Sequence, residues 1–375
     1  MTKSVCVIGL GYIGLPTAAM FATHGVKVHG VDNNKGIISI LQNHSIHLEE
    51  PGLKELVSEA FFSGMLTVSD EVKPSDVYII AVPTPFKHDT AGDFQGKKYK
   101  LSDMGAVISA TRSVLPHLKK GDLVILESTS PVRTTVDLLK PILEESGLTA
   151  GEDFSLAYSP ERVLPGQIIK ELQENARVIG GIDETSSIKG KELYSAFVKG
   201  QIYLSDSTTA EMVKLMENTY RDVNIAIANE FCRLADRFGV DVNEAIGIAN
   251  KHPRVKILNP GPGVGGHCIS VDPWFFVESA PDLANLIWTA RQVNDSQPAY
   301  VVNIIKSKVG SLVGKRIAAL GLSFKANVDD IRESPAVEVV QLLQKEGAIV
   351  KAFEPNKLAT EILGIPSCVT LKETV

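Results

Sequence analysis

Residues 4–14 read Ser-Val-Cys-Val-Ile-Gly-Leu-Gly-Tyr-Ile-Gly, and this stretch decides the fold. Five residues typical of a buried strand lead into Gly9-x-Gly11-x-x-Gly14, and a helix-like run continues to His24. In a dinucleotide-binding turn the first glycine permits the bend, the second lets the pyrophosphate reach the backbone, and the third packs helix on strand. The helix N-terminus then attracts the phosphate charge. The alternative is a glycine turn that holds no ligand.

The second strand supports the dinucleotide interpretation. It spans Lys27–Val31 and ends at Asp32. An acidic residue at this place binds ribose hydroxyls and repels a 2′-phosphate, so the sequence predicts NAD rather than NADP as the cofactor.

The same N-terminal region also has features of a signal peptide or membrane anchor, because 5–22 is uncharged and follows Lys3. Its glycines and Pro16 interrupt the run where a spanning helix would be continuous. We therefore expect a strand, a turn and a helix, and no membrane partner.

Strands and helices alternate through the first half of the chain. Apolar strand patterns cover 77–82 and 123–126, and helical patterns cover 103–115 and 134–145. Such alternation predicts a parallel sheet with helices on both faces.

The second half begins with a long helical pattern over 208–238 that contains neither glycine nor proline. Further on, a strand at 315–320, a helix at 336–345 and a strand at 349–353 form a second strand-helix-strand unit. The sequence thus predicts an α/β fold: two Rossmann-like doubly wound parallel-sheet domains joined by a helical central domain with a long spine helix. The expected domains are 1–200, 201–295 and 296–375.

Composition limits the functional classes. The chain has 375 residues, a net charge of -6 and no long basic run, which argues against nucleic acid as the main partner. Its four cysteines form no CxxC pair and no zinc-like spacing, so we expect a reduced, cytoplasmic protein.

Cys268 follows the glycine-rich run Gly261-Pro-Gly-Val-Gly-Gly-His267 and precedes Asp272. Glycines let a backbone approach a ligand closely, so this thiol is placed for attack on a substrate. A buried structural cysteine is the commoner fate of a free thiol and is the alternative. A metal site made by His267, Cys268 and Asp272 is a second alternative, but the spacing matches no common zinc pattern, and we predict no metal.

Two loops follow predicted strands: Val82-Pro-Thr-Pro85 and Glu127-Ser-Thr-Ser-Pro131. Ligands bind at the carboxyl ends of strands in such sheets, so Thr84 and Thr129 are expected to contact the cofactor or a bound water. Prolines that only shape the loops would give the same pattern.

On the long helix, Lys214 and Asn218 lie four residues apart and share a face, with Glu211 and Arg221 as neighbours. A catalytic lysine-asparagine pair is one interpretation, and a solvent-exposed charge stripe is the usual one.

Basic residues near the other loops leave a similar choice. His252, Arg254 and Lys256 precede the glycine-rich run, and Lys325 and Arg332 follow the strand at 315–320. They are suited to binding a diphosphate, or they form a solvated basic edge.

Taken together, these motifs resemble those of the UDP-glucose/GDP-mannose dehydrogenase family over nearly the whole length of the chain. The resemblance is carried by VIGLGYIGLPTAA, AVPTPFK, ILESTSPV, SPERVLPG, AEMVKLMENTYRDVNIA, HPRVKILNPGPGVGGHCISVDPWF and GLSFKANVDDIRESPA. It implies an NAD-dependent four-electron oxidation of a primary alcohol on a UDP-sugar to a carboxylate, through a thiohemiacetal and a thioester on Cys268. It also implies a homodimer or higher homo-oligomer in polysaccharide precursor synthesis.

The resemblance assigns roles residue by residue. As catalytic residues it implies Cys268, Lys214, Asn218, Asp272, Glu161 and Thr129. As NAD-binding residues it implies Gly9, Gly11, Tyr12, Ile13, Gly14, Asp32, Thr84, Thr129 and Arg332. As substrate-binding residues it implies Arg162, Val163, Lys214, Asn218, Arg221, His252, Arg254, Gly265 and Lys325.

His267 before the cysteine and the run Val271–Phe275 favour the N-acetylmannosamine branch of the family. The alternatives are a UDP-glucose or UDP-N-acetylglucosamine 6-dehydrogenase, a two-electron hydroxyacid-type dehydrogenase, and a non-catalytic NAD-binding relative. Because the chain stops at Val375, inside the expected nucleotide-sugar domain, we expect a shortened sheet there.

Overall fold

The computed structural model describes residues 4–266, 268–326 and 328–375. The chain divides into two compact units, one through Leu215 and the other Met216–Val375. Each is described by itself.

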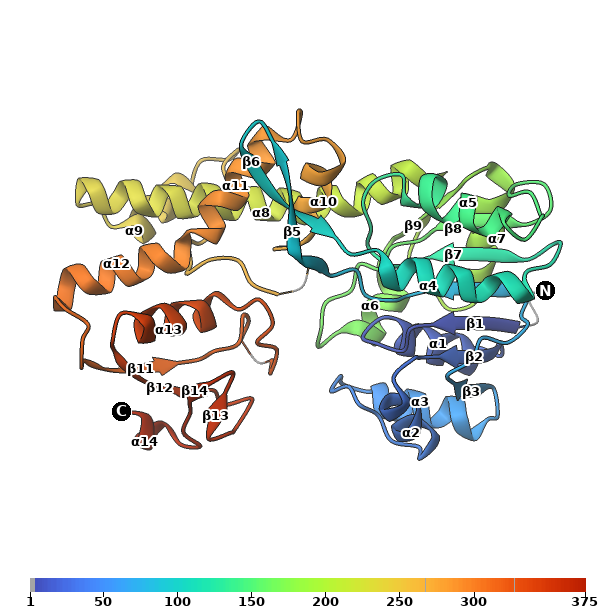
Figure 1. Ribbon diagram of the computed structural model, residues 1–375, viewed down its shortest axis with the longest axis horizontal. Coiled ribbons are helices and arrows are strands. Elements are labelled where there is room, and N and C mark those ends of the chain that lie inside the picture. Colours follow the sequence, from blue (N-terminus) through green and yellow to red (C-terminus); the bar gives the residue numbers. More distant parts are fainter. Residues whose placement is uncertain (1–3, 267, 327) are drawn as a thin grey trace. The chain divides into compact units, whose positions relative to one another are not determined.

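The first unit is built on a sheet with strand order β10-β9-β8-β7-β4-β1-β2-β3 (Figure 1). The strands are β1 (Ser4–Ile8), β2 (Lys27–Val31), β3 (Leu66–Ser69), β4 (Val77–Ile80), β7 (Leu123–Leu126), β8 (Ser155–Tyr158), β9 (Arg177–Gly181) and β10 (Ile202–Asp206). After β3 the chain returns to the other side of β1, so β1 and β4 flank the point where the strand order reverses. In such sheets this point is where ligands bind.

Its helices are α1 (Gly14–Thr23), α2 (Lys35–Gln42), α3 (Leu53–Phe62), α4 (Gly105–Val114), α5 (Lys140–Glu144), α6 (Ile168–Glu174) and α7 (Glu184–Tyr194). Short 3-10 and π-helical turns occupy Leu115–His117 and Thr135–Leu139. The predicted helical pattern over 134–145 is present through Glu144, with a π-helical turn at Thr135–Leu139 leading directly into α5. Side-chain caps at Asn34 and Asp183 bind the first-turn amides of α2 and α7.

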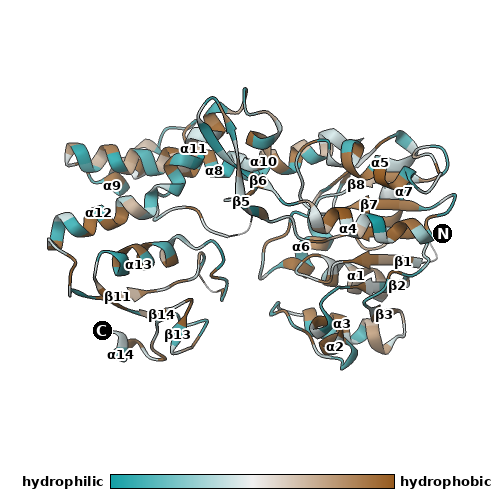
Figure 2. Ribbon diagram, in the orientation of Figure 1, coloured by the Kyte–Doolittle hydropathy of each residue, from teal (hydrophilic) through white to brown (hydrophobic). Residues whose placement is uncertain are grey.

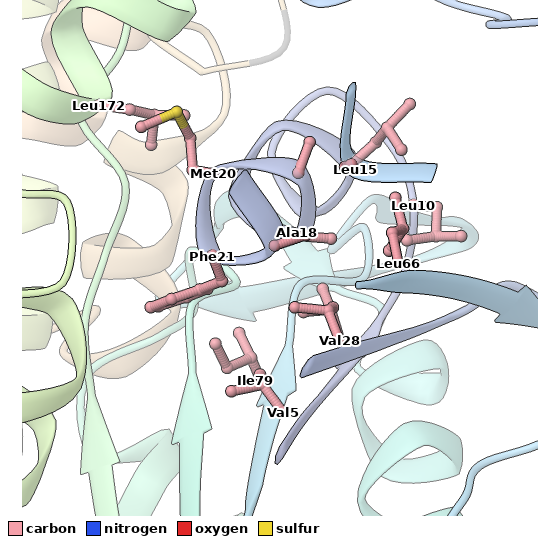
Figure 3. Close-up of a cluster of buried hydrophobic side chains, with 14 of the residues drawn as sticks. Val5, Leu10, Leu15, Ala18, Met20, Phe21, Val28, Leu66, Ile79 and Leu172 are labelled. Carbon is pink, nitrogen blue, oxygen red and sulfur yellow. The ribbon is translucent and has the colours of Figure 1, made fainter. Parts of the chain in front are cut away.

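Local pattern explains the central strands. The residues of β4 and β7 are all buried, as expected for parallel strands covered on both faces. The helix α1 is apolar nearly all round and packs Ala18, Met20 and Phe21 into a core with Val5, Val28 and Ile79 (Figure 3). That core holds β1, β2 and the glycine turn in register.

Two features depart from the predicted parallel sheet. Strand β9 pairs with β8 in the antiparallel sense, while β9 and β10 are parallel to each other. An antiparallel hairpin of β5 (Phe86–Phe94) and β6 (Lys97–Ser102), not predicted from the sequence, is inserted between β4 and α4.

The second unit contains most of α8 (Ser207–Phe238), the predicted spine helix. It continues with α9 (Val242–Ala249), α10 (Asp272–Ser279), α11 (Asn285–Asp295) and α12 (Gln297–Val309). A buried network joins α8 to α11, because Asp222 accepts hydrogen bonds from Arg291 (2.6 Å) and Asn294 (2.8 Å).

The final part of the chain is a small α/β unit. Strands β11 (Arg316–Leu320) and β12 (Ile349–Phe353) are parallel and are connected by α13 (Pro335–Lys345). A short hairpin of β13 (Glu361–Ile362) and β14 (Ile365–Pro366) and the helix α14 (Leu371–Thr374) follow. The predicted second strand-helix-strand unit is present, with two parallel strands among the described residues.

This unit repeats the strand-turn arrangement of the first unit. Gly321 follows β11 with φ +95°, as Gly9 follows β1 with φ +95°. Glu354 after β12 accepts a hydrogen bond from Leu322 N (2.8 Å), and Asp32 after β2 accepts one from Leu10 N (2.9 Å). In both units, an acidic residue after the second strand fixes the turn after the first.

Candidate active site

The glycine turn has the geometry that dinucleotide binding requires. Gly9 has a positive φ, and a Cβ there would lie 2.6 Å from the Ala81 carbonyl oxygen. A Cβ on Gly14 would lie 1.8 Å from the Gly9 carbonyl oxygen, so α1 can approach the turn only with glycine at this place. A Cβ on Gly11 would meet no described atom within 4 Å. Gly11 therefore leaves an open space at the N-terminus of α1, where a pyrophosphate fits.

Asp32 lies beside this turn. Its Oδ2 accepts from Leu10 N at 2.9 Å and its Oδ1 accepts from Asn34 N at 2.8 Å. The carboxylate is thus fixed at the end of β2, where ribose hydroxyls bind in this fold. Tyr12 and Ile13, also predicted to contact NAD, are half-buried in the turn itself. Together these residues fit NAD.

The structure joins the two predicted threonine loops. The Thr84 hydroxyl donates to the Thr129 carbonyl oxygen at 2.7 Å, and the Ser128 hydroxyl donates to the Val82 carbonyl oxygen at 2.7 Å. These bonds tie the loops after β4 and β7 together at the carboxyl edge of the sheet.

Glu161 follows β8 at the same edge and is part of a buried cluster that the sequence did not reveal. Its Oε1 accepts from Arg162 N (2.8 Å), and its Oε2 pairs with Arg177. Arg177 also lies near Glu127, whose Oε1 accepts from the Tyr194 hydroxyl at 2.5 Å. Glu127 stands in the quoted loop after β7, but its partners are about fifty residues or more away in the sequence, so no local pattern points to them.

Burial changes the acid-base properties of this cluster. Desolvation raises the pKa of Glu127 to about 7, and the charge of Arg177 only partly opposes this effect. Burial, together with the charge of Glu127, raises the pKa of Tyr194 well above its usual range, so its hydroxyl keeps the proton that it donates.

Arg162 and Val163, predicted to contact substrate, follow Glu161. The Arg162 guanidinium donates to the Ala176 carbonyl oxygen, and Asn175 Nδ2 donates to the Arg162 carbonyl oxygen at 3.1 Å. Val163 packs against the core of the unit. The loop is also held from its far end, because buried Glu50 accepts from Gly166 N and Ile168 N, both at 2.8 Å.

The lysine-asparagine face of α8 is not a surface charge stripe. Lys214 and Asn218 are 8% and 7% exposed. Glu211 is fully buried and accepts hydrogen bonds from Arg133 N, Thr135 N and the Thr135 hydroxyl. The solvated-stripe alternative was therefore wrong, because these side chains face protein interior. Within the described ranges, Lys214 makes no hydrogen bond or ion pair.

In the second unit, the side chains of Asn218 and Asp272, two residues with implied catalytic roles, contact each other. Asn218 Nδ2 donates to Asp272 Oδ2 at 2.5 Å, and both side chains are buried. The Asp272 amide also donates to the Cys268 carbonyl oxygen at 2.8 Å. The half-buried Cys268 thus lies one helical turn before Asp272, the first residue of α10.

The glycines before Cys268 are required by protein packing. A Cβ on Gly265 would lie 2.6 Å from Phe324 Cβ and 2.7 Å from Pro335 Cδ, and one on Gly266 would lie 2.9 Å from the Phe324 ring. Asn229 holds the start of the loop by accepting from Gly261 N at 2.8 Å. The backbone of this loop therefore closely approaches Phe324 and Pro335.

The predicted basic residues of the second unit are mostly exposed. Arg221, His252, Arg254 and Lys325 face solvent. Arg332 forms an ion pair with Asp330 at 2.7 Å and is also predicted as an NAD contact.

His267, part of the metal alternative and of the branch assignment, lies outside the described residues. In the remainder of the chain, no group of three His, Cys, Asp or Glu residues is arranged to hold a metal ion. The described helices include none long and apolar enough to cross a membrane.

Three family models match the chain. They are the NAD-binding, central and UDP-binding domains of the UDP-glucose/GDP-mannose dehydrogenase family, at residues 3–198, 208–296 and 318–375.

Among similar proteins, UDP-N-acetyl-D-mannosamine dehydrogenase of Methanococcus maripaludis is 50% identical over 356 residues, which is 94% of this chain and 80% of that protein. The enzyme of the same name from Campylobacter jejuni is 49% identical and covers 94% of this chain and 87% of its own length. The solved UDP-N-acetyl-mannosamine dehydrogenase of S. aureus is 47% identical, with a TM-score of 0.89 over 100% of this chain and 86% of that one.

The matched models cover most of the chain, and the glycine turn with Asp32 has the geometry of an NAD site. This chain therefore belongs to the UDP-glucose/GDP-mannose dehydrogenase family and is an NAD-dependent UDP-sugar dehydrogenase.

Proposed function

We propose that this enzyme oxidises the C6 alcohol of UDP-N-acetyl-D-mannosamine to the carboxylate. The substrate is inferred from the similar proteins that carry this activity in their names. One alcohol, two NAD⁺ and one water give one carboxylate, two NADH and three protons. The product is an activated uronic acid suited to polysaccharide biosynthesis.

The observation that carries the mechanism is the position of Cys268 one backbone turn before Asp272, whose carboxylate accepts a hydrogen bond from buried Asn218. NAD, when bound, accepts one hydride in each oxidation. Between the two oxidations, the Cys268 thiolate attacks the aldehyde carbon and forms a thiohemiacetal. Loss of the second hydride gives a thioester, and water releases the carboxylate and the free thiol.

Lys214 has the position of a proton-transferring and oxyanion-stabilising group in this scheme. It is buried, lies one turn from Asn218 on α8, and has no partner in the described part of the chain. A buried ammonium without an opposite charge is unfavourable, so the Lys214 ammonium would pair with an alkoxide or oxyanion of the substrate. Asn218 would bind the same oxygen, and Asp272 would orient Asn218.

At the sheet edge, Thr129 and Glu161 would position the water used in the oxidation and hydrolysis steps. Arg162, Val163, Arg221, His252, Arg254, Gly265 and Lys325 would bind the UDP-sugar, and Arg332 would contact NAD. The proposed domain division remains 1–200, 201–295 and 296–375, and the cysteine pattern favours a cytoplasmic enzyme.

The direct test is the number of NADH molecules formed per UDP-N-acetyl-D-mannosamine consumed, measured by absorbance with the purified chain. We expect two. One NADH per sugar would indicate a two-electron alcohol dehydrogenase, and turnover only with UDP-glucose or UDP-N-acetylglucosamine would overturn the substrate assignment. Absence of turnover with all three sugars would contradict the catalytic function.

Cysteine variants test the covalent step in the same assay. Cys268→Ser is expected to abolish carboxylate formation while NAD still binds, since a serine hydroxyl is a much weaker nucleophile than a thiolate. Cys232→Ser, on α8, is the matched control and should retain turnover. Full turnover in Cys268→Ser would rule out the thioester.

A further inference from the structure

Arg177, the first residue of β9, lies between two carboxylates that come from neighbouring strand ends. Its Nη2 pairs with Glu161 Oε2 after β8, and its Nη1 lies 3.5 Å from Glu127 Oε1 after β7. Nη1 also donates to the Ser159 hydroxyl at 3.0 Å. The guanidinium lies 4.1 Å from the centre of the Tyr194 ring, a distance typical of a cation–π contact.

These groups are shielded from water. The side chains of Arg177, Glu161 and Glu127 are 5%, 7% and 0% exposed, and Tyr194 is fully buried. A buried carboxylate that loses its cationic partner is strongly unfavourable, so the position of each group depends on the others.

The charges of the cluster do not balance. One guanidinium faces two carboxylates, and Glu127 Oε2 makes no hydrogen bond to any described residue. The titratable groups around Arg177 are Glu127 after β7, Glu161 after β8 and Tyr194 on α7. The raised pKa of Glu127 reduces the excess negative charge, and Tyr194 adds none because it keeps its proton. This leaves Glu161 as the main ionic partner of Arg177.

We propose that Arg177 is a positioning residue for the dehydrogenation. It fixes the carboxylate of Glu161 at the carboxyl edge of the sheet, while Ser159, Glu127 and Tyr194 fix Arg177 from its other sides. This inference rests on the proposed function, in which Glu161 positions the reacting water. Arginine suits this role because its planar fork contacts Glu161 and Ser159 at the same time, whereas lysine offers a single charged point.

The test is a double-mutant cycle between Arg177 and Glu161, with UDP-N-acetyl-D-mannosamine and NAD as substrates. Arg177→Met should lower kcat by about tenfold to a hundredfold, in the range seen when the partner of a functional side chain is removed. The KM values for sugar and NAD should stay within about twofold, since the affected interaction acts on the reaction rather than on binding. In the Glu161→Gln background, Arg177→Met should change kcat by less than about twofold.

A merely structural role would give a different pattern. The loss of kcat caused by Arg177→Met would then persist in the Glu161→Gln background, and the two losses would multiply. Either this result or an unchanged kcat in Arg177→Met would overturn the proposal. If Arg177→Met does not fold, the same cycle with Arg177→Lys decides. A kcat loss that disappears in the Glu161→Gln background supports the proposal, and an unchanged kcat overturns it.

Two controls separate this proposal from the proposed function. Arg112→Met, which removes an exposed ion pair with Glu145 in the same unit, should keep kcat. NAD affinity, measured by calorimetry, should match that of the wild type in all folded variants. A wild-type chain that oxidises no UDP-sugar would refute the proposed function and this assignment with it, whereas an active wild type with an active Arg177→Met variant would refute the assignment alone.

Discussion

At the scale of single residues, burial gives ordinary side chains unusual properties. Glu127 would be a common surface acid elsewhere, but its place after a fully buried strand removes it from water and raises its pKa to about 7. Burial raises the pKa of Glu211 as well, although three hydrogen-bond donors from the turn before α5 oppose this effect. The sequence identifies both as glutamates and cannot distinguish their surroundings.

The raised pKa of Glu127 predicts a pH-dependent contribution to stability. The usual pKa of a glutamate is 4.5, so between pH 4.5 and about 7 the unfolded chain releases this proton more readily than the folded chain. Unfolding is therefore favoured as the pH rises through this window. Glu127→Gln should remove a fall on the order of 1–3 kcal/mol in the free energy of unfolding between pH 5 and pH 8.

Urea unfolding of the wild type and Glu127→Gln at pH 5 and pH 8 measures this difference, and other titrating groups cancel because both proteins share them. Asp137→Asn, which changes an exposed acid of the same unit, is the control. Equal pH dependence in the wild type and Glu127→Gln would contradict the prediction.

At the scale of elements, the turn between β1 and α1 separates glycines that serve packing from one that leaves room for a ligand. Gly9 and Gly14 lie against backbone oxygens of Ala81 and Gly9, whereas Gly11 faces open space. Glycine is therefore needed at Gly9 and Gly14 for backbone packing and at Gly11 for ligand space, as the sequence pattern predicted.

A pair of alanine variants tests this division. Gly14→Ala should lower the free energy of unfolding by about 3 kcal/mol, because its methyl group would overlap the Gly9 carbonyl and force α1 away from the turn. Gly11→Ala should change stability by less than about 1 kcal/mol, yet weaken NAD binding at least about tenfold, because the methyl group occupies the pyrophosphate space. Urea unfolding and NAD calorimetry measure the two effects, and equal NAD affinity in Gly11→Ala and the wild type would disprove the assigned role.

At the scale of the whole molecule, α8 leaves an apolar face exposed in its second-unit part. Met216, Tyr220, Ile227, Phe231, Leu234 and Phe238 are each at least 41% exposed. Their spacing of three, four or seven residues places them along one side of the helix. Figure 2 shows both hydrophobic and hydrophilic residues along the length of α8. We propose that a second copy of the chain covers this face in a homodimer, with the same patch on both subunits.

Charge substitution on this face should therefore change the oligomeric state. Phe231→Glu combined with Leu234→Glu is expected to shift the molecular mass measured by light scattering from dimer to monomer, since two carboxylates from each subunit would be buried at the interface. Val313→Glu, at an apolar residue that is 75% exposed in a loop, is the control and should stay dimeric. A dimeric α8 variant, or a monomeric wild type, would contradict the assignment.

The sequence by itself determined the dinucleotide fold, most strand positions and the spine helix, and it supplied the candidate residues of the site. These depend on local information: the period of apolar residues, the spacing of glycines and the acid after the second strand. Strands β1, β2 and β7 have the predicted bounds, and α8 begins one residue before the prediction.

Only the tertiary structure decided which side chains meet. The reversed direction of β9 brings Arg177 to the strand ends that carry Glu127 and Glu161, and no periodicity in the sequence specifies that direction. Packing against Phe324 and Pro335 likewise explains the requirement for glycine at Gly265 and Gly266. Side-chain partners are set by which strands and loops become neighbours in space, and residues far apart in the chain leave no local trace of that choice.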